Sequence, residues 1–583
     1  MQIRPTALAA AIALSCGSAT AAQPEFSLQL NALSSYVGSG AGQGGTGIEI
    51  VAYDAATRRV FAINAGRNSL DVVDLASPAQ PVRVAVIDFA PYGGGVNGVA
   101  VHDGLVAVAS EAQVKTDRGS VVFLDAATLE VLGQVPAGAL PDMLTFTPDG
   151  EYLLVANEGE PSEDYGVDPT GSVTVVDLRS GVPGATARTA GFEAWIGQES
   201  GLRAAGVRIF GMQRLVGPDG TVTRVPSNAA QDFEPEYITV QGPRAYVTLQ
   251  ENNAVAVLDI GKARIESILP LGFKDHSLAA NRLDASDRDG PDADGLPPTT
   301  SRINIRDWPV YGMFQPDSIA TLKVRNEVFL LTANEGDARV YPTAGGIVPN
   351  PSGGFFGEGG IFNEEVRVGS SGYVLDPDVF GNASTLKQNA NLGRLTVTNT
   401  LGAREADADP QFERIHSFGA RSFSIWDPRA MRATAPFTAP NAGLVWDSGD
   451  QFEQITASVY RAYFNASNSN VTRDDRSDNK GPEPEGITVG RVGPRDYAFI
   501  GLERIGTVMV YDVTNPREPQ FVQYLNTRSF GNDALPGQND SGAEGVSFVA
   551  AEESPTGRPL LLVGNEVSQT LAVFEIEPLR TRR

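Results

Sequence analysis

Acidic residues occupy two fixed positions of a sequence pattern that recurs along the chain. Glu485 begins one short apolar run and Glu503 ends the next, while Glu544 and Glu566 hold the same positions in the last copy. If the two runs form an antiparallel hairpin, the start of the first lies beside the end of the second. Carboxylate oxygens gathered in this way are ligands for hard divalent cations, Ca²⁺ or Mg²⁺ rather than zinc.

The pattern can be placed seven times, with Gly98 the exception at the first position and Asn64 the exception at the second. The metal ligands predicted at these positions are Glu49, Asp142, Glu158, Glu236, Glu251, Asp317, Glu335, Glu485, Glu503, Glu544 and Glu566, and Glu111 is a further acid of the series. So many acids on one rim would repel, so they must hold protons, recruit basic side chains or bind cations. We expect bound Ca²⁺, with Mg²⁺ or Mn²⁺ as alternatives; a purely structural ring of solvated acids is the competing interpretation.

Basic residues stand next to several of these acids. Arg339 follows Glu335, Arg504 follows Glu503, and Lys480 precedes Glu485. A divalent cation beside such side chains could bind a phosphate oxygen and support metal-assisted hydrolysis. The predicted catalytic residues are therefore Glu485, Glu335, Arg339, Lys480 and Arg504. Simple pairing of each basic residue with a neighbouring acid is the alternative.

A second acidic cluster lies at 284–294, where aspartates alternate with other residues before Gly295. Alternating Asp closed by Gly resembles a calcium-binding loop, although the Glu that completes an EF-hand loop is missing. Asp287 and Asp289 are the predicted ligands here, and a solvated loop is the alternative.

The composition excludes several other chemistries. The formal net charge of −25 argues against a nucleic-acid partner, because an acidic surface repels phosphate backbones. A single Cys and three His residues leave no internal disulfide, thiolate zinc site or His-rich metal site. The Gly-rich stretch at 40–47 lacks the strand and helix of a nucleotide site, so no organic cofactor is predicted. The expected partner is a small phosphate ester or a surface ligand, and a monomer is expected.

The elements that must position the acids are short β-strands. Each copy contains three runs rich in β-branched and aromatic residues, bounded by Gly, Pro, Asn or Asp. Seven copies predict an all-β, seven-bladed propeller, one domain over 23–583, whose ring is closed by a strand from 26–30. The excess length forms predicted insertions on one face, near 181–230, 262–314, 340–414 and 428–482, and these could also conceal a small extra domain.

Residues 1–22 have the features of an export signal: a positive start, an apolar run and a small-residue cleavage site. A buried N-terminal helix is the alternative, and Cys16 gives a minor lipoprotein interpretation. No other segment provides the ~20 apolar residues of a membrane helix. We expect an exported protein, periplasmic or extracellular, and the end of the sequence at 577–583 carries no apolar anchor.

Phrases spread over most of the chain resemble the choice-of-anchor I family of exported bacterial propellers. They are found at 284–290, 304–312, 332–339, 362–367, 419–427, 447–453 and 478–486. Some relatives are labelled alkaline phosphatases, and Glu-Pro-Glu-Gly at 483–486 is similar to phytase-like esterase propellers. The resemblance therefore implies an exported metal-dependent phosphoesterase. A non-catalytic, calcium-loaded propeller that binds a ligand or protein is the alternative, since propellers host both kinds of function.

Overall fold

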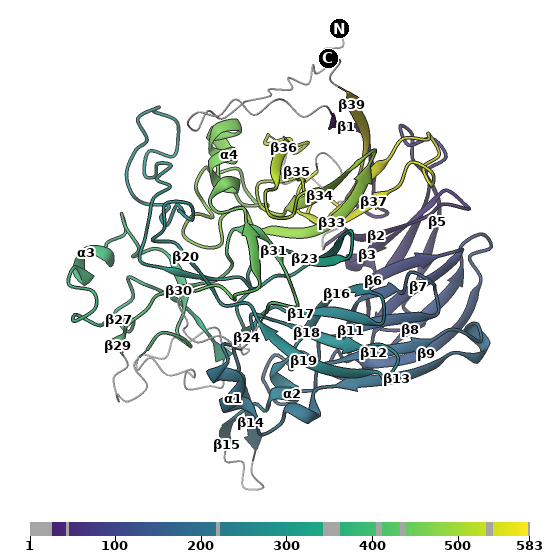
Figure 1. The fold of residues 1–583 in the computed structure, drawn as a ribbon, viewed down its shortest axis with the longest axis horizontal. Coiled ribbons are helices and arrows are strands. Elements are labelled where there is room, and N and C mark those ends of the chain that lie inside the picture. The colour runs from purple at the N-terminus through teal and green to yellow at the C-terminus, as the bar shows by residue number, and fades with distance from the viewer. Residues whose placement is uncertain are drawn as a thin grey trace.

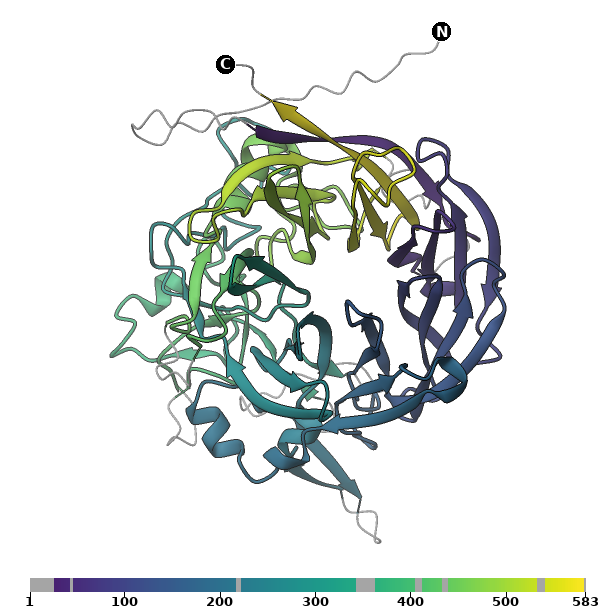
Figure 2. The same ribbon diagram turned by 45° about the vertical axis from the view of Figure 1, so that its right-hand side comes forward.

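The computed structural model describes residues 26–41, 46–216, 222–341, 362–403, 411–431, 439–531 and 540–580. The predicted signal peptide and Cys16 lie outside the described residues. Within them the chain is built almost entirely from strands, and seven antiparallel sheets have four strands each. Figure 2 shows these sheets arranged around a common axis. The prediction of an all-β propeller is confirmed.

The first four sheets follow one another along the chain. Their strands are β2 (Ile48–Asp54), β3 (Arg59–Asn64), β4 (Ser69–Asp74), β5 (Val82–Asp88); β6 (Gly95–His102), β7 (Leu105–Glu111), β8 (Arg118–Asp125), β9 (Val131–Ala139); β10 (Pro141–Phe146), β11 (Tyr152–Asn157), β12 (Ser172–Asp177), β13 (Thr186–Gly191); and β16 (Pro235–Gln241), β17 (Arg244–Leu249), β18 (Ala254–Asp259), β19 (Arg264–Pro270).

The last three sheets complete the ring. Their strands are β22 (Ile319–Val324), β23 (Glu327–Asn334), β31 (Ser422–Trp426), β32 (Leu444–Asp447); β33 (Pro484–Val492), β34 (Arg495–Leu502), β35 (Val508–Asp512), β36 (Gln520–Leu525); and β37 (Ala543–Val549), β38 (Leu560–Asn565), β39 (Thr570–Arg580) with β1 (Phe26–Val37). The first strand of each sheet contacts the first strand of the next, and β37 returns to β2.

The N-terminal strand closes the ring as predicted. β1 pairs antiparallel with β39, so the last sheet takes its outer strand from the start of the chain. Leu28 and Leu30 are buried in a core shared with the preceding sheet, and the backbone N–H of Leu30 donates to the side chain of Gln523 at 2.8 Å. Joining the two chain ends in this way removes an exposed sheet edge.

The hydrophobic core is divided among the interfaces between neighbouring sheets. The cluster between the first two sheets contains fully buried Phe61, Val72 and Val106. Central strands such as β12 and β18 are covered on both faces, which explains why their sequences are short continuous apolar runs. The outer strand β5 is largely exposed.

The regions predicted as insertions have regular structure. Near its start, each of three insertions contains the fourth strand of a sheet. These strands are β13, β19 and β32, and the sequence pattern alone did not reveal them. A further five-stranded sheet joins β20 (Phe273–Asp275), β21 (Tyr311–Met313), β30 (His416–Ser417), β28 (Thr396–Thr398) and β26 (Glu365–Arg367). It packs with a core of its own that includes Trp308, Tyr373 and Leu395.

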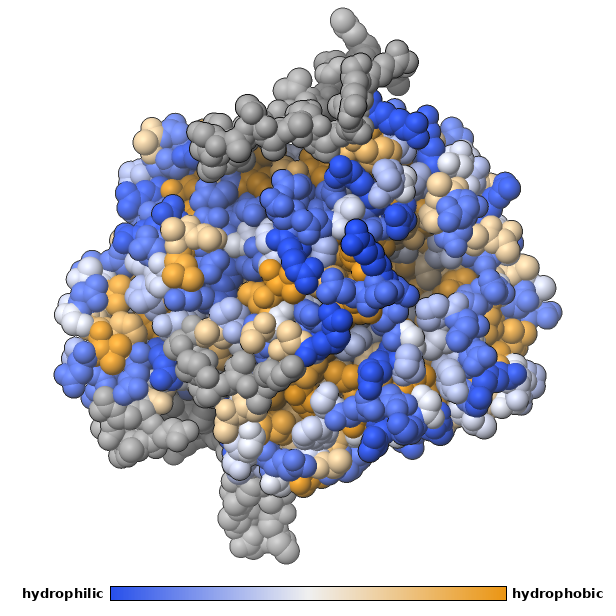
Figure 3. Space-filling view, in the orientation of Figure 1, coloured by the Kyte–Doolittle hydropathy of each residue, from blue (hydrophilic) through white to orange (hydrophobic). Residues whose placement is uncertain are grey.

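Smaller elements complete the described structure, most of them within or beside the insertions. They are β14 (Met212–Val216), β15 (Val222–Pro226), β24 (Val340–Tyr341), β25 (Phe362–Asn363), β27 (Val374–Leu375), β29 (Gln411–Phe412), α1 (Glu199–Ala204), α2 (Ala229–Asp232), α3 (Ala383–Leu386), α4 (Gln451–Val459) and short 3₁₀ turns at Ala65–Arg67, Val182–Gly184, Glu193–Trp195 and Arg461–Tyr463. Several of them, including α3, β27 and β29, gather on the left of the molecule in Figure 1. Figure 3 shows that the surface seen from this side is mainly hydrophilic.

Candidate metal centre

A β-bulge near the start of most inner strands positions the acids. In the β10–β11 pair, Pro141 faces Asn157 but Leu144 faces Val155, so β10 carries one extra residue where Asp142 lies. The same irregularity places Glu49, Glu236, Glu485 and Glu544 in bulges of β2, β16, β33 and β37. Because a bulge bends its strand and re-aims a side chain, it explains why these acids leave the sheet.

The register also corrects the two exceptions in the predicted series. In β6 the extra residue is Asn97, not Gly98, and its amide donates to the backbone oxygen of Pro141 at 3.0 Å. Asn64 at the end of β3 pairs with Ile48, and Asn157 at the end of β11 pairs with Pro141, so the two asparagines are equivalent. The residue that corresponds to Glu158 is therefore Ala65. Two neutral residues therefore interrupt the series, each one position away from the residue that the sequence pattern indicated.

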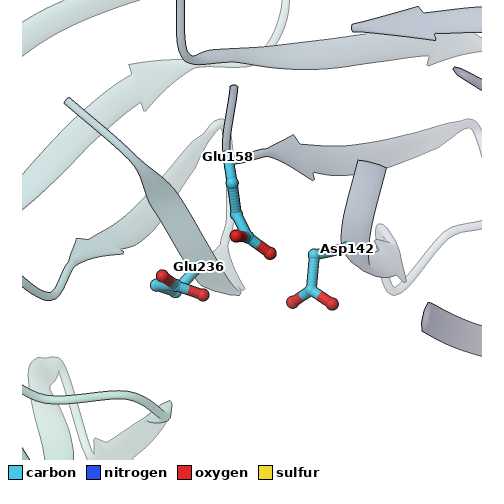
Figure 4. A group of neighbouring side chains, drawn as sticks. All are labelled: Asp142, Glu158 and Glu236. Atoms are coloured by element: carbon cyan, nitrogen blue, oxygen red, sulfur yellow. The ribbon is translucent and has the colours of Figure 1, made fainter. Parts of the chain in front are cut away.

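The first carboxylate cluster contains Asp142, Glu158 and Glu236 (Figure 4). One oxygen of each lies within 4.8 Å of the others, and all three residues are half-buried. Burial, together with Glu160, raises the pKa of Asp142 to about 6. Burial also raises the pKa of Glu158 and of Glu236 well above the ordinary value, and neighbouring carboxylates add to the effect.

The second cluster contains Glu335, Glu485 and Glu503, again within 4.8 Å of one another. Burial raises the pKa of Glu503 to about 8, although Arg504 opposes the shift. Burial likewise raises the pKa of Glu335 against the opposing effect of Lys480. The pKa of Glu485 is raised well above its usual range by burial and by neighbouring acids, and its buried Oε2 atom makes no hydrogen bond.

The remaining predicted acids connect the two clusters. Burial raises the pKa of Glu49 to about 8, with Glu566 and Asp142 contributing, and the pKa of Glu544 is raised by burial and then by Glu49 and Glu566. On the other side, burial raises the pKa of Glu251 to about 7. Asp317 also has a raised pKa, through burial first and then through acids of both clusters, Glu335 and Asp142. Glu111 instead lies near Lys115 and Glu160.

Two of the predicted basic residues lie beside the second cluster. The ammonium of Lys480 forms an ion pair with Glu335 and lies 3.2 Å from Oε2 of Glu483. Nε of Arg504 lies 2.9 Å from Oε2 of Glu483 and 3.1 Å from Oε2 of Glu503.

Glu483 was not singled out by the sequence as a site residue. It is fully buried, and although burial alone would raise its pKa, Lys480, Arg504 and Arg476 hold that pKa well below the usual range. Its one sequence signal is the phrase Glu-Pro-Glu-Gly, which also contains Glu485.

The ion pairs of Arg339 are made with acids outside the two clusters. Its buried guanidinium is 2.9 Å from Glu234 and 3.3 Å from Asp232, and it stacks on Phe210. It also donates to the backbone oxygen of Asp232. The predicted catalytic role of Arg339 therefore receives no support from its position, which is that of a buried structural ion pair.

The predicted ligands Asp287 and Asp289 are held by arginines. Asp287 lies 2.7 Å from Arg394, and Asp289 lies 3.2 Å from Arg302. In the described part of the chain, the only groups of three metal-ligating side chains are the two clusters above. A cavity of about 540 Å³, lined by Tyr92 and Arg118 among others, includes none of the clustered acids.

The two clusters fit a hard divalent cation. Ca²⁺ takes six to eight oxygen ligands at about 2.3–2.6 Å, so ligands that share one ion lie within about 5 Å of each other. The oxygens of each cluster meet that limit and belong to carboxylates alone. The unpaired Oε2 atom of Glu485 is a further donor that has no other partner. Waters or backbone oxygens would complete the coordination.

Comparison with known proteins assigns the chain to a family. The choice-of-anchor I domain matches residues 49–516. The chain belongs to this family. The matched choice-of-anchor I region contains both carboxylate clusters, together with Lys480, Glu483 and Arg504, whereas Glu544 and Glu566 follow it. Membership of this family indicates an exported or surface-located protein. Among the described residues, no helix is long and apolar enough to cross a bilayer.

The similar proteins have varied names. Gigasin-3a of Magallana gigas is 28% identical over 210 residues, which cover 33% of this chain and 68% of that protein. A mesenchyme-specific cell surface glycoprotein of Strongylocentrotus purpuratus is 28% identical over 308 residues, 49% of this chain and 36% of its own length. This choice-of-anchor I chain thus spans about a third of the glycoprotein.

Two solved structures were also matched. Hydrazine synthase of Kuenenia stuttgartiensis has 12% identity and a TM-score of 0.39, with 92% of this chain and 96% of that chain covered. A streptogramin B lyase has 8% identity and a TM-score of 0.38, with 95% and 98% covered.

Proposed function

We propose that this choice-of-anchor I protein is an exported, divalent-cation-dependent phosphoesterase. The observation that carries the proposal is the cluster of Glu335, Glu485 and Glu503 with Lys480 and Arg504 in contact with it. Carboxylates that would repel one another and basic side chains that bind anions lie side by side. A bound cation would neutralise the carboxylates, and a phosphate ester would pair with the basic side chains.

The buried carboxylates give a physical reason for a bound cation. Buried neighbouring carboxylates with raised pKa values exchange their protons for a divalent cation, which removes the repulsion. We propose Ca²⁺ as the natural occupant, because carboxylate oxygen is a hard ligand and the spacing suits a flexible coordination sphere. Mg²⁺ and Mn²⁺ are the alternatives, and adding each metal separately to chelator-treated protein distinguishes them from Ca²⁺.

The roles of the side chains follow from their positions. A bound cation would polarise the phosphoryl group and lower the pKa of a bound water. Lys480 and Arg504 would bind the non-bridging oxygens and keep the ester oriented. With Oε2 of Glu485 on the cation, the other oxygen of this carboxylate would be placed to accept a proton from water.

A second candidate function is a non-catalytic, calcium-loaded binding surface. The cluster of Asp142, Glu158 and Glu236 favours it, because the strongest electrostatic neighbours of these residues are other carboxylates. A cation there would lie near Glu160, whose carboxylate is already paired with Lys115 at 2.6 Å, and it would act through structure or through a surface ligand.

The test is hydrolysis by the chain from residue 23 onward. p-Nitrophenyl phosphate and bis-p-nitrophenyl phosphate would be offered to chelator-treated protein with and without Ca²⁺, Mg²⁺ or Mn²⁺, and bound metal would be measured in the same samples. We expect turnover that vanishes on chelation, returns with one metal, and is lost in Glu485→Gln and Glu335→Gln but kept in Glu111→Gln. Protein that binds cations and melts cooperatively yet hydrolyses neither ester would favour the binding surface instead.

A further inference from the structure

Three basic side chains surround the single buried carboxylate of Glu483. Nε and Nη2 of Arg476 donate to its Oε1 atom at 2.9 and 2.6 Å. Lys480 and Arg504 lie 3.2 and 2.9 Å from its Oε2 atom. Glu483 is thus paired on both oxygens and is shared by all three basic side chains.

The basic side chains keep donors for another partner. The hydrogen bonds of Arg504 within the described structure use only Nε, so both of its terminal nitrogens remain available. Arg476 uses Nε and Nη2 and keeps Nη1. Each arginine side chain retains 21% exposure, whereas the side chain of Glu483 has none, so a ligand from solvent reaches the arginines and not Glu483.

Lys480 and Arg504 link this group to the carboxylate cluster. Lys480 contacts Glu335 and Arg504 contacts Glu503, both from the cluster proposed to hold the cation. An anion held by these side chains would therefore lie next to the bound ion. The fixed fork of an arginine matches two oxygens of one phosphate group, and this geometry is maintained because Glu483 holds the side chains in place.

We propose that Glu483 positions Arg476, Arg504 and Lys480 as a subsite for a doubly charged terminal phosphate, which makes the site selective for phosphate monoesters over diesters. This inference rests on the proposed phosphoesterase function and specifies its substrate class. A monoester offers three non-bridging oxygens and two charges to the available guanidinium donors of Arg476 and Arg504. A diester offers two such oxygens and one charge.

The experiment compares Arg476→Gln, Arg504→Lys and Glu483→Gln with a matched control, Arg495→Gln. Arg495 pairs with Asp512 in the same sheet, at the opposite end of β34 from Leu502, and is of similar exposure. We expect kcat/KM for p-nitrophenyl phosphate to fall about tenfold or more in the three site variants while bis-p-nitrophenyl phosphate changes much less. Binding of inorganic phosphate to the Ca²⁺-loaded protein, measured by calorimetry, would weaken in parallel. The control would match the wild type in both.

The outcomes separate this inference from the proposed function. Hydrolysis that is impaired equally for both esters, or phosphate binding unchanged in Arg476→Gln and Arg504→Lys, would overturn the subsite and leave the phosphoesterase standing. Phosphate binding that is lost in the site variants of a protein without hydrolytic activity would support the subsite and overturn the phosphoesterase. Arg476→Gln and Arg504→Lys keep the test valid if Glu483→Gln, which leaves three cations without their anchor, does not fold.

Discussion

Glu485 is the residue at which stability and function conflict most directly. Burial and neighbouring acids raise its pKa, and one buried oxygen has no hydrogen-bond partner. Replacement by Gln removes a repelling carboxylate and a cation ligand together. We expect Glu485→Gln to melt at a higher temperature than the wild type in chelator at about pH 8, and to lose most of the stabilisation that Ca²⁺ gives. That stabilisation is about 2.7 kcal/mol at a free cation concentration of 100 times Kd.

Glu111→Gln is the matched control for this measurement. Glu111 is the last residue of β7, and its position corresponds to that of Glu158, which directly follows β11. Glu111 nevertheless lies near Lys115 and outside both clusters. Its melting temperature with and without Ca²⁺ should follow that of the wild type. A Glu485→Gln protein that gains as much from Ca²⁺ as the control would show that the cation binds elsewhere.

Arg339 gives a second prediction at the scale of one side chain. Because its guanidinium is buried between Glu234 and Asp232, Arg339→Gln would leave two buried carboxylates without their partner. Breaking a buried ion pair from one side costs about 3–5 kcal/mol. We expect chemical denaturation to show a loss of this size, while the fraction that remains folded keeps its Ca²⁺ affinity. A variant of unchanged stability that has lost hydrolysis would restore the catalytic role suggested by the sequence.

At the scale of elements, the hairpins could be predicted from the sequence but their exact register could not. The short apolar runs and flanking acids identified the inner strands and placed Glu485 beside Glu503. Bulges add one residue to one strand, and the apolar run does not show where the extra residue lies, so the pattern indicated Gly98 where the structure has Asn97. The outer strand β13, Thr-Ala-Arg-Thr-Ala-Gly, is largely exposed and has no large apolar residue, so it lacks the apolar run that marks a strand.

The closing strand provides a prediction about an element. Leu30 is 1% exposed and packs in the core between the last two sheets, whereas the adjacent Gln29 is half-buried. Leu30→Ala should lower the free energy of unfolding by about 2–5 kcal/mol, because it leaves a cavity at the point where the ring closes. Denaturant titration should show a much smaller change for Gln29→Ala. Equal effects of the two substitutions would mean that closure depends on backbone pairing with β39 rather than on this contact.

At the scale of the whole molecule, the insertions contribute what the repeats lack. Lys480, Arg476 and Glu483 come from the segment that follows α4, yet Lys480 contacts Glu335, which directly follows β23 far earlier in the chain. Repeat analysis could find the acids because they recur. It could not find the anchor of the basic side chains, because Glu483 occurs once and its partners are set by tertiary folding.

The acid ring also predicts how stability depends on pH. Burial first, and neighbouring acids second, raise the pKa of Glu49 and Glu503 from 4.5 to about 8 and that of Glu251 to about 7. At a pH between 4.5 and these raised pKa values, the folded protein holds protons that the unfolded chain has released. The contribution of these groups is therefore fully present below about pH 4.5 and is lost as the pH rises toward about 8.

We expect the melting temperature of chelated protein to fall across this pH window, because deprotonation leaves buried charges facing one another. Excess Ca²⁺ should remove most of that fall, since the cation takes the place of the protons. A chelated protein equally stable at about pH 5 and about pH 8 would contradict both the raised pKa values and the demand for a cation that follows from them.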